Sequence, residues 1–218
     1  QLPPGLTMAA AQAHLQSMSS AFGATVEDVF SSPEAASVNL KGLPPRPGLV
    51  ETVEVPGGPF KMGFDNEVVD IPAFKISKYP VTNAQYLEFV QSTDYQSEGQ
   101  WAAPEGGAYP EGPESLGNHP ARLTYYDLKA FAKWVGGHIP TREQWEKAGR
   151  GTEGNRFPWG NDWRPELVNH DSGGSTPVNQ FEQAGNVSPY GAVDMVGNVL
   201  EWVDGGATRR PGAAFLKG

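Results

Sequence analysis

The sequence contains no cysteine among its 218 residues. This absence excludes disulfide bonds, cysteine-ligated zinc sites and a thiol nucleophile within the chain. It does not indicate a compartment, because a chain without cysteine suits oxidising and reducing environments equally. The chain has 4 histidines, and no two of them have the i, i+4 spacing of a helical metal site.

Long apolar runs and an excess of positive charge are also missing. No run approaches the roughly 18 apolar residues of a membrane-spanning helix, and the amino end lacks the basic and apolar regions of a signal peptide. We therefore expect a soluble protein without a membrane span, with a slight preference for the cytoplasm. Lys and Arg number 16 against 25 Asp and Glu, which gives a formal net charge of -9. Because phosphate backbones require clustered basic residues, we expect no nucleic-acid partner.

Glycine and proline, by contrast, are abundant. The chain has 27 glycines and 20 prolines, yet 38% of its residues are hydrophobic. That hydrophobic content is too high for a disordered chain, so the glycines and prolines are expected in loops around a packed centre. A long helical bundle is excluded.

The composition predicts two parts. Residues 7–22 are rich in Ala, Gln and Ser and place Leu15, Met18 and Phe22 on one face of a helix. Residues 44–48 then form a proline-rich linker. We predict a helical amino-terminal arm with its linker over 1–48, packing on the main domain or on another subunit. The main domain is predicted over 49–218.

The main domain has the pattern of an α+β fold. Alternating or short apolar stretches predict strands at 49–55, 60–63 and 74–77. Helices are predicted to begin at capping boxes, in which a Thr is followed three residues later by Gln or Asp. These pairs are Thr82 with Gln85, Thr124 with Asp127, and Thr141 with Gln144. The strands and helices do not alternate regularly, which favours α+β over a parallel α/β sheet.

Residues 94–120 differ from the rest of the domain. They are rich in Pro and Gly, contain several acidic residues and include no Lys or Arg. A structureless stretch of this length is uncommon in a compact domain. We predict a mobile acidic surface insertion.

Five segments, in this order and spacing, carry a family resemblance. They are ISKYPVTNAQY (76–86), NHP (118–120), PTREQWEKA (140–148), FPWGN (157–161) and YGAVDMVGNVLEW (190–202). With them the chain, from about residue 50 onward, resembles the formylglycine-generating enzyme, or sulfatase-modifying factor, family. The resemblance implies a loop-rich α+β fold of the C-type-lectin-like kind. Trp145, Trp159 and Trp202 within these segments are interpreted as anchors that hold the loops.

The same resemblance implies an activity that this chain lacks the residues to perform. Enzymes of the family oxidise a sulfatase cysteine to formylglycine, using a cysteine pair that binds copper beyond a Gly-Gly-Ser-Trp-like motif. Residues 213–218, AAFLKG, resemble the entry to that motif. No catalytic residue is therefore assigned, and the functional surface is expected in polypeptide beyond Gly218.

Calcium is the cofactor that the resemblance implies, in a structural role. One site matches the turn motif through Asp194, Gly197, Val199 and Glu201. Gly197 and Val199 would contribute carbonyl oxygens and Glu201 a carboxylate, which are the ligands that this hard cation prefers. Asn169 and Asp171 are candidates for a second site. The alternative is that all these groups hydrogen-bond the loops directly.

Three functions stay open at this stage. The first is a non-catalytic ligand-binding module, similar to the variable proteins of diversity-generating retroelements. Those proteins display a surface that binds ligands, and the partner here would be a protein or another surface ligand. The second is a formylglycine-generating oxidase whose catalytic part lies outside this chain. The third is a helper domain in a regulatory protein, to which the amino-terminal arm faintly points. We favour the binding module.

Overall fold

A computed structural model describes residue 46 and residues 48–170, 172–205 and 214–217, the last four by their backbone only. The predicted arm and linker lie outside the described residues except for Arg46 and Gly48, so the helical arm and the boundary near 48 stay predictions. Arg46 contacts the main domain: its backbone N–H donates to the Trp134 carbonyl at 3.0 Å, and its guanidinium pairs with Glu88 at 2.9 Å.

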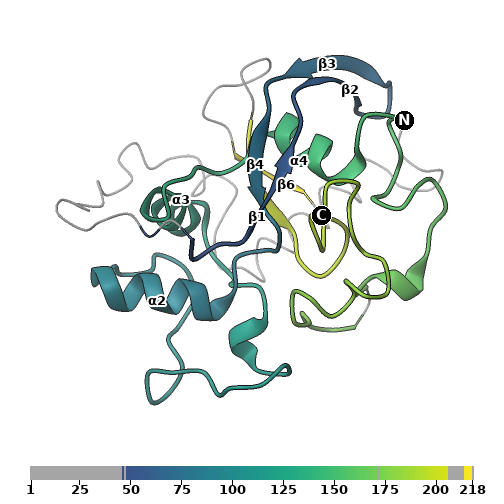
Figure 1. The fold of residues 1–218 in the computed structure, drawn as a ribbon. Helices are drawn as coiled ribbons and strands as arrows, with labels where there is room; N and C mark the ends of the chain where they lie inside the picture. The colour runs from purple at the N-terminus through teal and green to yellow at the C-terminus, as the bar shows by residue number, and fades with distance from the viewer. Residues whose placement is uncertain (1–45, 47, 171, 206–213, 218) are drawn as a thin grey trace, which may run out of the picture. The chain divides into compact units, whose positions relative to one another are not determined.

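The first elements of the domain form a long, bent antiparallel ribbon (Figure 1). Its strands are β1 (Thr52–Val55), β2 (Gly58–Met62), β3 (Glu67–Ile71) and β4 (Phe74–Ser77). β1 pairs with β4 and β2 with β3, in one register that continues across the bend. The bend lies at Pro56 and Gly57, opposite Pro72 and Ala73, where proline removes backbone donors from the ladder.

The predicted strands are found with altered limits. The first begins at Thr52 rather than at 49, and the second spans Gly58–Met62, while Phe74–Ser77 agrees with the prediction. The strand β3 had not been predicted. Its sequence, EVVDI, is exposed or half-exposed along its whole length, so it lacks the alternation that marks a half-buried strand.

All three predicted helices begin at their capping boxes. They are α2 (Asn83–Thr93), α3 (Tyr125–Trp134) and α4 (Arg142–Arg150). In each, the Thr hydroxyl accepts from the backbone N–H three residues on, and the side chain at that residue accepts from the Thr backbone. The chain continues with 3₁₀ turns at Leu116–Asn118 and Pro165–Leu167, and with the antiparallel pair β5 (Glu201–Asp204) and β6 (Ala214–Lys217). These short elements among loops confirm the prediction of a loop-rich α+β domain.

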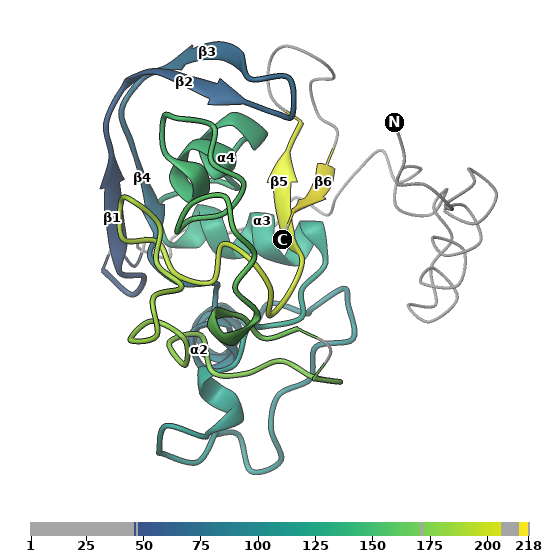
Figure 2. The ribbon, with the colours of Figure 1, turned by 90° about the vertical axis from the view of Figure 1, so that its right-hand side faces the viewer.

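The main core surrounds α4. In Figure 2, α4 lies between the ribbon on one side and β5 and β6 on the other. Buried side chains from β1, β4, α4 and β5, and from the turn before β5, meet there: Val55, Ile76, Trp145, Ala148, Ala192, Met195 and Val203. Trp145, interpreted from the sequence as an anchor, is 7% exposed here, and Ala148 is fully buried on the same helix. The core thus holds the turn at 190–201 against α4.

A second cluster, between α2 and α3, is aromatic. Tyr86 and Phe89 of α2 meet Phe131 and Trp134 of α3, with centroid distances of 5.4 Å for Phe89–Trp134 and 5.9 Å for the edge-to-face pair Phe89–Phe131. All four side chains are buried. Such pairs add stabilisation beyond their area of burial, so these two helices form one packed unit.

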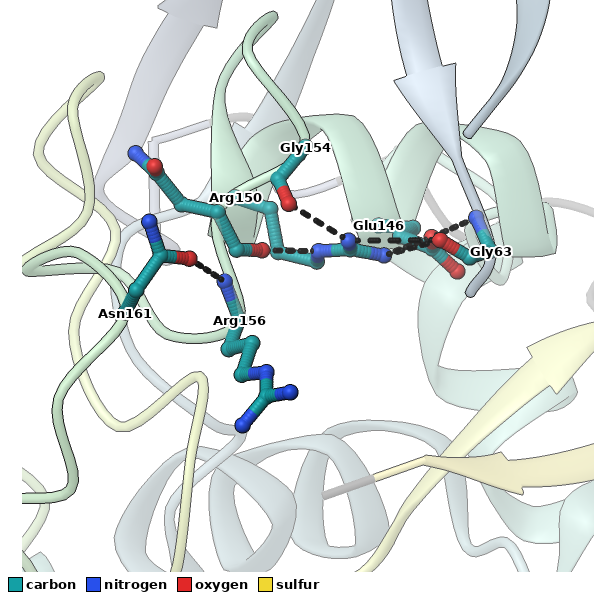
Figure 3. A network of polar contacts seen from close by, with 7 residues as sticks. Gly63, Glu146, Arg150, Gly154, Arg156 and Asn161 are labelled. Carbon is teal, nitrogen blue, oxygen red and sulfur yellow. Dashed lines mark hydrogen bonds and ion pairs between the residues drawn. The ribbon is translucent and has the colours of Figure 1, made fainter. Parts of the chain in front are cut away.

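The tip of the ribbon is fastened to α4 by a polar network (Figure 3). The Gly63 N–H donates to Glu146 Oε1 at 2.5 Å, and Arg150 pairs with the same carboxylate. Arg150 also donates to the carbonyls of Gly63 and Gly154. Glu146 is only 4% exposed. Phe64, which follows Gly63 at the tip of the ribbon, is fully exposed. The tip therefore presents an aromatic ring on a backbone that is held in place.

The acidic insertion is attached to α2 and α3 at several points. Gln91 Nε2 donates to the Gly107 carbonyl at 2.7 Å, and Trp101 Nε1 to Asn83 Oδ1 at 3.0 Å. The backbone N–H of Glu98 donates to the buried Asp127 at 2.8 Å. Between α2 and the insertion the surface is hollowed by a cavity of about 670 Å³. No helix within the described residues combines the length and apolar composition that a membrane span requires.

Candidate metal centre

The turn that precedes β5 contains several left-handed residues. Asp194 and Asn198 have φ values of 58° and 62°, and Gly197 has 81°. Asp and Asn tolerate this region better than other side chains do. Gly197 is required for a further reason, since a Cβ there would lie 2.9 Å from the Asn169 carbonyl oxygen. The turn can therefore fold back closely and direct several polar groups to one place.

Asp194 is buried within this turn and has few donors. Its side chain is 2% exposed. One carboxylate oxygen accepts from Asn198 Nδ2 at 2.9 Å, and the other accepts from Asn186 Nδ2 at 3.4 Å. Burial raises the pKa of the Asp194 carboxyl to about 6, although the bond from Asn198 opposes the rise. The ionised Asp194 carboxylate therefore has too few hydrogen-bond donors to offset the cost of burying its charge.

Glu201, the first residue of β5, is the second carboxylate. Its Oε2 accepts from Trp145 Nε1 at 2.9 Å. Burial of the carboxyl raises the pKa of Glu201 to about 7, and the nearby Asp194 adds to the rise, while the bond from Trp145 lowers it. A negative charge on Asp194 makes ionisation of Glu201 less favourable. A cation bound between the two carboxylates would remove this repulsion.

Asn198 and Asn169 link the two predicted sites. The Asn198 backbone N–H donates to the Asn169 carbonyl at 3.0 Å, and Asn169 Nδ2 donates to Asn198 Oδ1 at 3.1 Å. Asn198 Oδ1 also accepts from the Thr176 N–H at 2.8 Å. The structure therefore brings Asn169 against the Gly197–Asn198 turn. Asp171 lies outside the described residues.

Asn186 is the residue that sequence reasoning missed. It is 1% exposed, and its Nδ2 donates to Asp194 Oδ1 and, at 3.2 Å, to the Val196 carbonyl. Its Oδ1 is buried and has no hydrogen-bond partner in the described part of the chain. In the sequence, Gly185 and Asn186 have only the pattern of a turn, so no signal identified this amide as part of a site.

The donor set suits a hard cation. Within the described residues no three His, Cys, Asp or Glu side chains gather as a metal centre. A cation here would therefore need neutral oxygens beside Asp194 and Glu201, of the kind that the carbonyls of Gly197 and Val199 could supply. The Gly197 carbonyl also accepts from the Val199 N–H at 2.8 Å. Carboxylate and carbonyl oxygens on flexible turns fit Ca²⁺, which accepts about six to eight oxygens, and the two raised pKa values fit a missing positive charge.

Comparison with known proteins gives consistent matches. Residues 41–212 match the family described as sulfatase-modifying factor enzyme 1-like domain. Hercynine oxygenase of Mycolicibacterium smegmatis is 34% identical over 77% of this chain, but the match spans only 48% of that relative. Formylglycine-generating enzyme of Thermomonospora curvata is 29% identical, covering 69% of each chain. The inactive C-alpha-formylglycine-generating enzyme 2 of Bos taurus is 30% identical, covering 70% of each.

A solved structure shows the same fold. The crystal structure of CarF aligns with a TM-score of 0.52 at 21% identity, covering 77% of this chain and 84% of CarF. At this identity the likeness concerns the fold alone. Because the family match spans most of the described domain, the resemblance seen in the sequence is confirmed. The chain belongs to the sulfatase-modifying factor enzyme 1-like domain family and has the formylglycine-generating-enzyme type of fold.

Proposed function

We propose that this chain is a non-catalytic ligand-binding module built on a formylglycine-generating-enzyme-like scaffold. The observation that carries the proposal is the absence of cysteine from all 218 residues. Copper ligated by thiolates, as the family resemblance implies for its oxidases, requires two cysteines. These 218 residues therefore supply a framework without the oxidising centre.

The use of buried polar groups supports this proposal. Asp127 holds α2, α3 and the acidic insertion together, and Glu146 holds the ribbon tip. Lys147 donates to the Gly58 carbonyl at 2.8 Å, again fixing the ribbon to α4. Each of these groups positions a loop or strand. A surface on loops held in this way can change its side chains at little cost to folding.

The comparisons support the same proposal, because one relative carries the name of an inactive protein. They also supply the second candidate function. Two other relatives are named as a hercynine oxygenase and a formylglycine-generating enzyme. On that alternative the chain is part of a formylglycine-generating oxidase, and the cysteines that bind copper belong to polypeptide outside these 218 residues.

A turnover assay tests whether these 218 residues are non-catalytic. The chain is incubated with copper, oxygen and a sulfatase peptide that contains the target cysteine, and aldehyde formation is followed by mass spectrometry. The formylglycine-generating enzyme of Thermomonospora curvata serves as the positive control. We expect turnover only in the control. Turnover by this chain would overturn the binding-module proposal.

The scaffold proposal has its own test on the ribbon. Phe64 is fully exposed and Phe60, on the same ribbon, is 2% exposed. Phe64→Ser is expected to change the free energy of unfolding by less than about 0.5 kcal/mol, whereas Phe60→Ser should cost about 3 kcal/mol or more. Equal costs in urea unfolding would show that the tip is a structural part of the domain and not a display position.

We further propose that a structural calcium ion supports the turn at Asp194 and Glu201. The raised pKa values and the oxygen donors described above support it. A ligand at one hundred times its dissociation constant stabilises the folded state by about 2.7 kcal/mol. The melting temperature should therefore be higher in calcium than in EDTA, with magnesium as the control cation. Identical melting curves in calcium and EDTA would contradict the proposal.

A further inference from the structure

The unpartnered oxygen of Asn186 is an exception inside this domain. Buried polar atoms in native proteins nearly always have a hydrogen-bond partner, and an orphaned one costs about 1–3 kcal/mol. Ser97 Oγ and Asn186 Oδ1 are the buried side-chain atoms without a partner in the described residues. The Asn186 amide lies beside the carboxylate of Asp194, which is itself buried.

The Asn186 amide is also held loosely. Both bonds from Nδ2 are long, 3.4 Å to Asp194 Oδ1 and 3.2 Å to the Val196 carbonyl. A strong bond to a charged acceptor is normally nearer 2.7–2.9 Å. The hydrogen-bearing nitrogen therefore stands between two oxygens, in the kind of place that a cation would take.

The number of oxygen ligands that calcium needs also points to the Asn186 amide. Asp194, Glu201 and the proposed carbonyls of Gly197 and Val199 provide fewer oxygens than the six to eight of a Ca²⁺ ion, unless both carboxylates bind in bidentate fashion. A neutral amide oxygen adds a ligand without adding charge repulsion. We propose that Asn186 is an additional ligand of the calcium ion at this turn, its amide rotating so that Oδ1 faces the ion beside Asp194. This inference rests on the proposal that the turn binds calcium.

The test uses the full chain and terbium as a luminescent substitute for calcium. Trp145, whose indole nitrogen lies 2.9 Å from Glu201 Oε2, is placed to sensitise terbium emission from the site. Calcium affinity follows from competition against terbium. The variants are Asn186→Leu, which keeps the branched shape of the side chain but removes both polar atoms, and Asn186→Asp, which restores an oxygen with charge. Asn179→Leu, at an exposed position, is the control.

We expect Asn186→Leu to weaken calcium binding at least tenfold, and Asn186→Asp to bind at least as tightly as the wild type. In EDTA the Leu variant should melt near the wild-type temperature, because removing the orphaned oxygen offsets the loss of the two long bonds from Nδ2 to Asp194 and to the Val196 carbonyl. In calcium it should melt below the wild type.

Two results would overturn this inference alone. One is wild-type calcium affinity in Asn186→Leu, and the other is an equal loss of melting temperature in calcium and in EDTA, which would identify Asn186 as a purely structural donor. If the wild type itself shows neither terbium emission nor a calcium-dependent melting temperature, the calcium proposal fails and this inference fails with it.

Discussion

Two buried aspartates in this domain have opposite surroundings. Asp127, fully buried at the start of α3, accepts from four donors: Tyr86 Oη at 3.1 Å, the Glu98 N–H at 2.8 Å, the Thr124 N–H at 3.1 Å and the Thr124 hydroxyl at 2.7 Å. Asp194 has two amide donors, one of them at 3.4 Å, and lies near a second carboxyl group.

The difference separates a structural carboxylate from a candidate ligand. Several donors compensate the charge of Asp127, so this residue completes its region without any added group. The region of Asp194 and Glu201 is left with uncompensated charge and a spare oxygen, which an external cation would complete. Burial alone therefore does not distinguish the two roles; the number of donors does.

The largest effect is expected from Asp127→Asn. One carboxylate oxygen of Asp127 would become an NH₂ group, which cannot accept hydrogen bonds. Its N–H groups would then face either the two Thr124 donors or the donors of Tyr86 and Glu98. We expect a loss of about 3 kcal/mol in the free energy of unfolding, measured in urea, with no dependence on calcium. A loss below about 1 kcal/mol would mean that Asp127 is not the junction of α2, α3 and the insertion.

Trp202→Ala tests the link between the two regions. Trp202, in β5 directly after Glu201, donates through Nε1 to the Leu123 carbonyl at 3.0 Å and meets the Tyr125 ring edge-to-face at 5.9 Å. Because the side chain is only partly buried, we expect a cost of about 2 kcal/mol, below that of a fully buried Trp. A cost under about 0.5 kcal/mol would show that the ring does not anchor this strand. Urea unfolding in EDTA measures it.

Asp194→Asn should behave opposite to Asp127→Asn. In EDTA it removes a poorly compensated charge, and Asn186 can turn its spare oxygen to accept from the new amide. The left-handed backbone at 194 also suits Asn. We expect stability in EDTA to be unchanged or raised by about 1 kcal/mol, with loss of calcium stabilisation. Destabilisation in EDTA matching that of Asp127→Asn would remove the distinction between the two aspartates.

The smallest effect is a pH dependence in EDTA. Because the folded pKa values of Asp194 and Glu201, about 6 and about 7, lie above their ordinary values, the folded state binds more protons than the unfolded state between about pH 4.5 and 6. The contribution of this pair to stability therefore falls as the pH rises toward 7. Subtracting the pH profile of Asp194→Asn should leave a wild-type excess of roughly 1 kcal/mol at pH 5.5 relative to pH 7.5. A flat difference would contradict the raised pKa values.

The sequence predicted the helices well because their signals are local. Thr82, Thr124 and Thr141 each cap a helix through a partner three residues away, so the pattern is complete within four positions. Strand β3 escaped prediction because its position depends on pairing with β2, while its own side chains are mostly exposed. The sequence predicted separate strands at 49–55 and 60–63, whereas one register continues across the bend at Pro56 and Gly57 into β2.

The candidate site was predicted only in part, for a related reason. The turn motif from Asp194 to Glu201 lies in one continuous segment that the family resemblance covers. Asn169 reaches the same turn, although the family resemblance had assigned it to a separate site. The contribution of Asn186 depends on which of its two amide atoms lacks a partner, and that follows from contacts between residues distant from the local sequence pattern.

The unbroken register of the ribbon also limits how its length can vary. Thr52 faces Ser77 before the bend, and Gly58 faces Ile71 after it. Deleting one residue from only one side of the ribbon, between Thr52 and Phe60, would shift the alternation of side chains by one position and turn Phe60 outward. Deleting opposed residues from both sides would keep the alternation and merely shorten the reach of Phe64. Length changes that occur in matched pairs are therefore the ones that this part of the fold can accept.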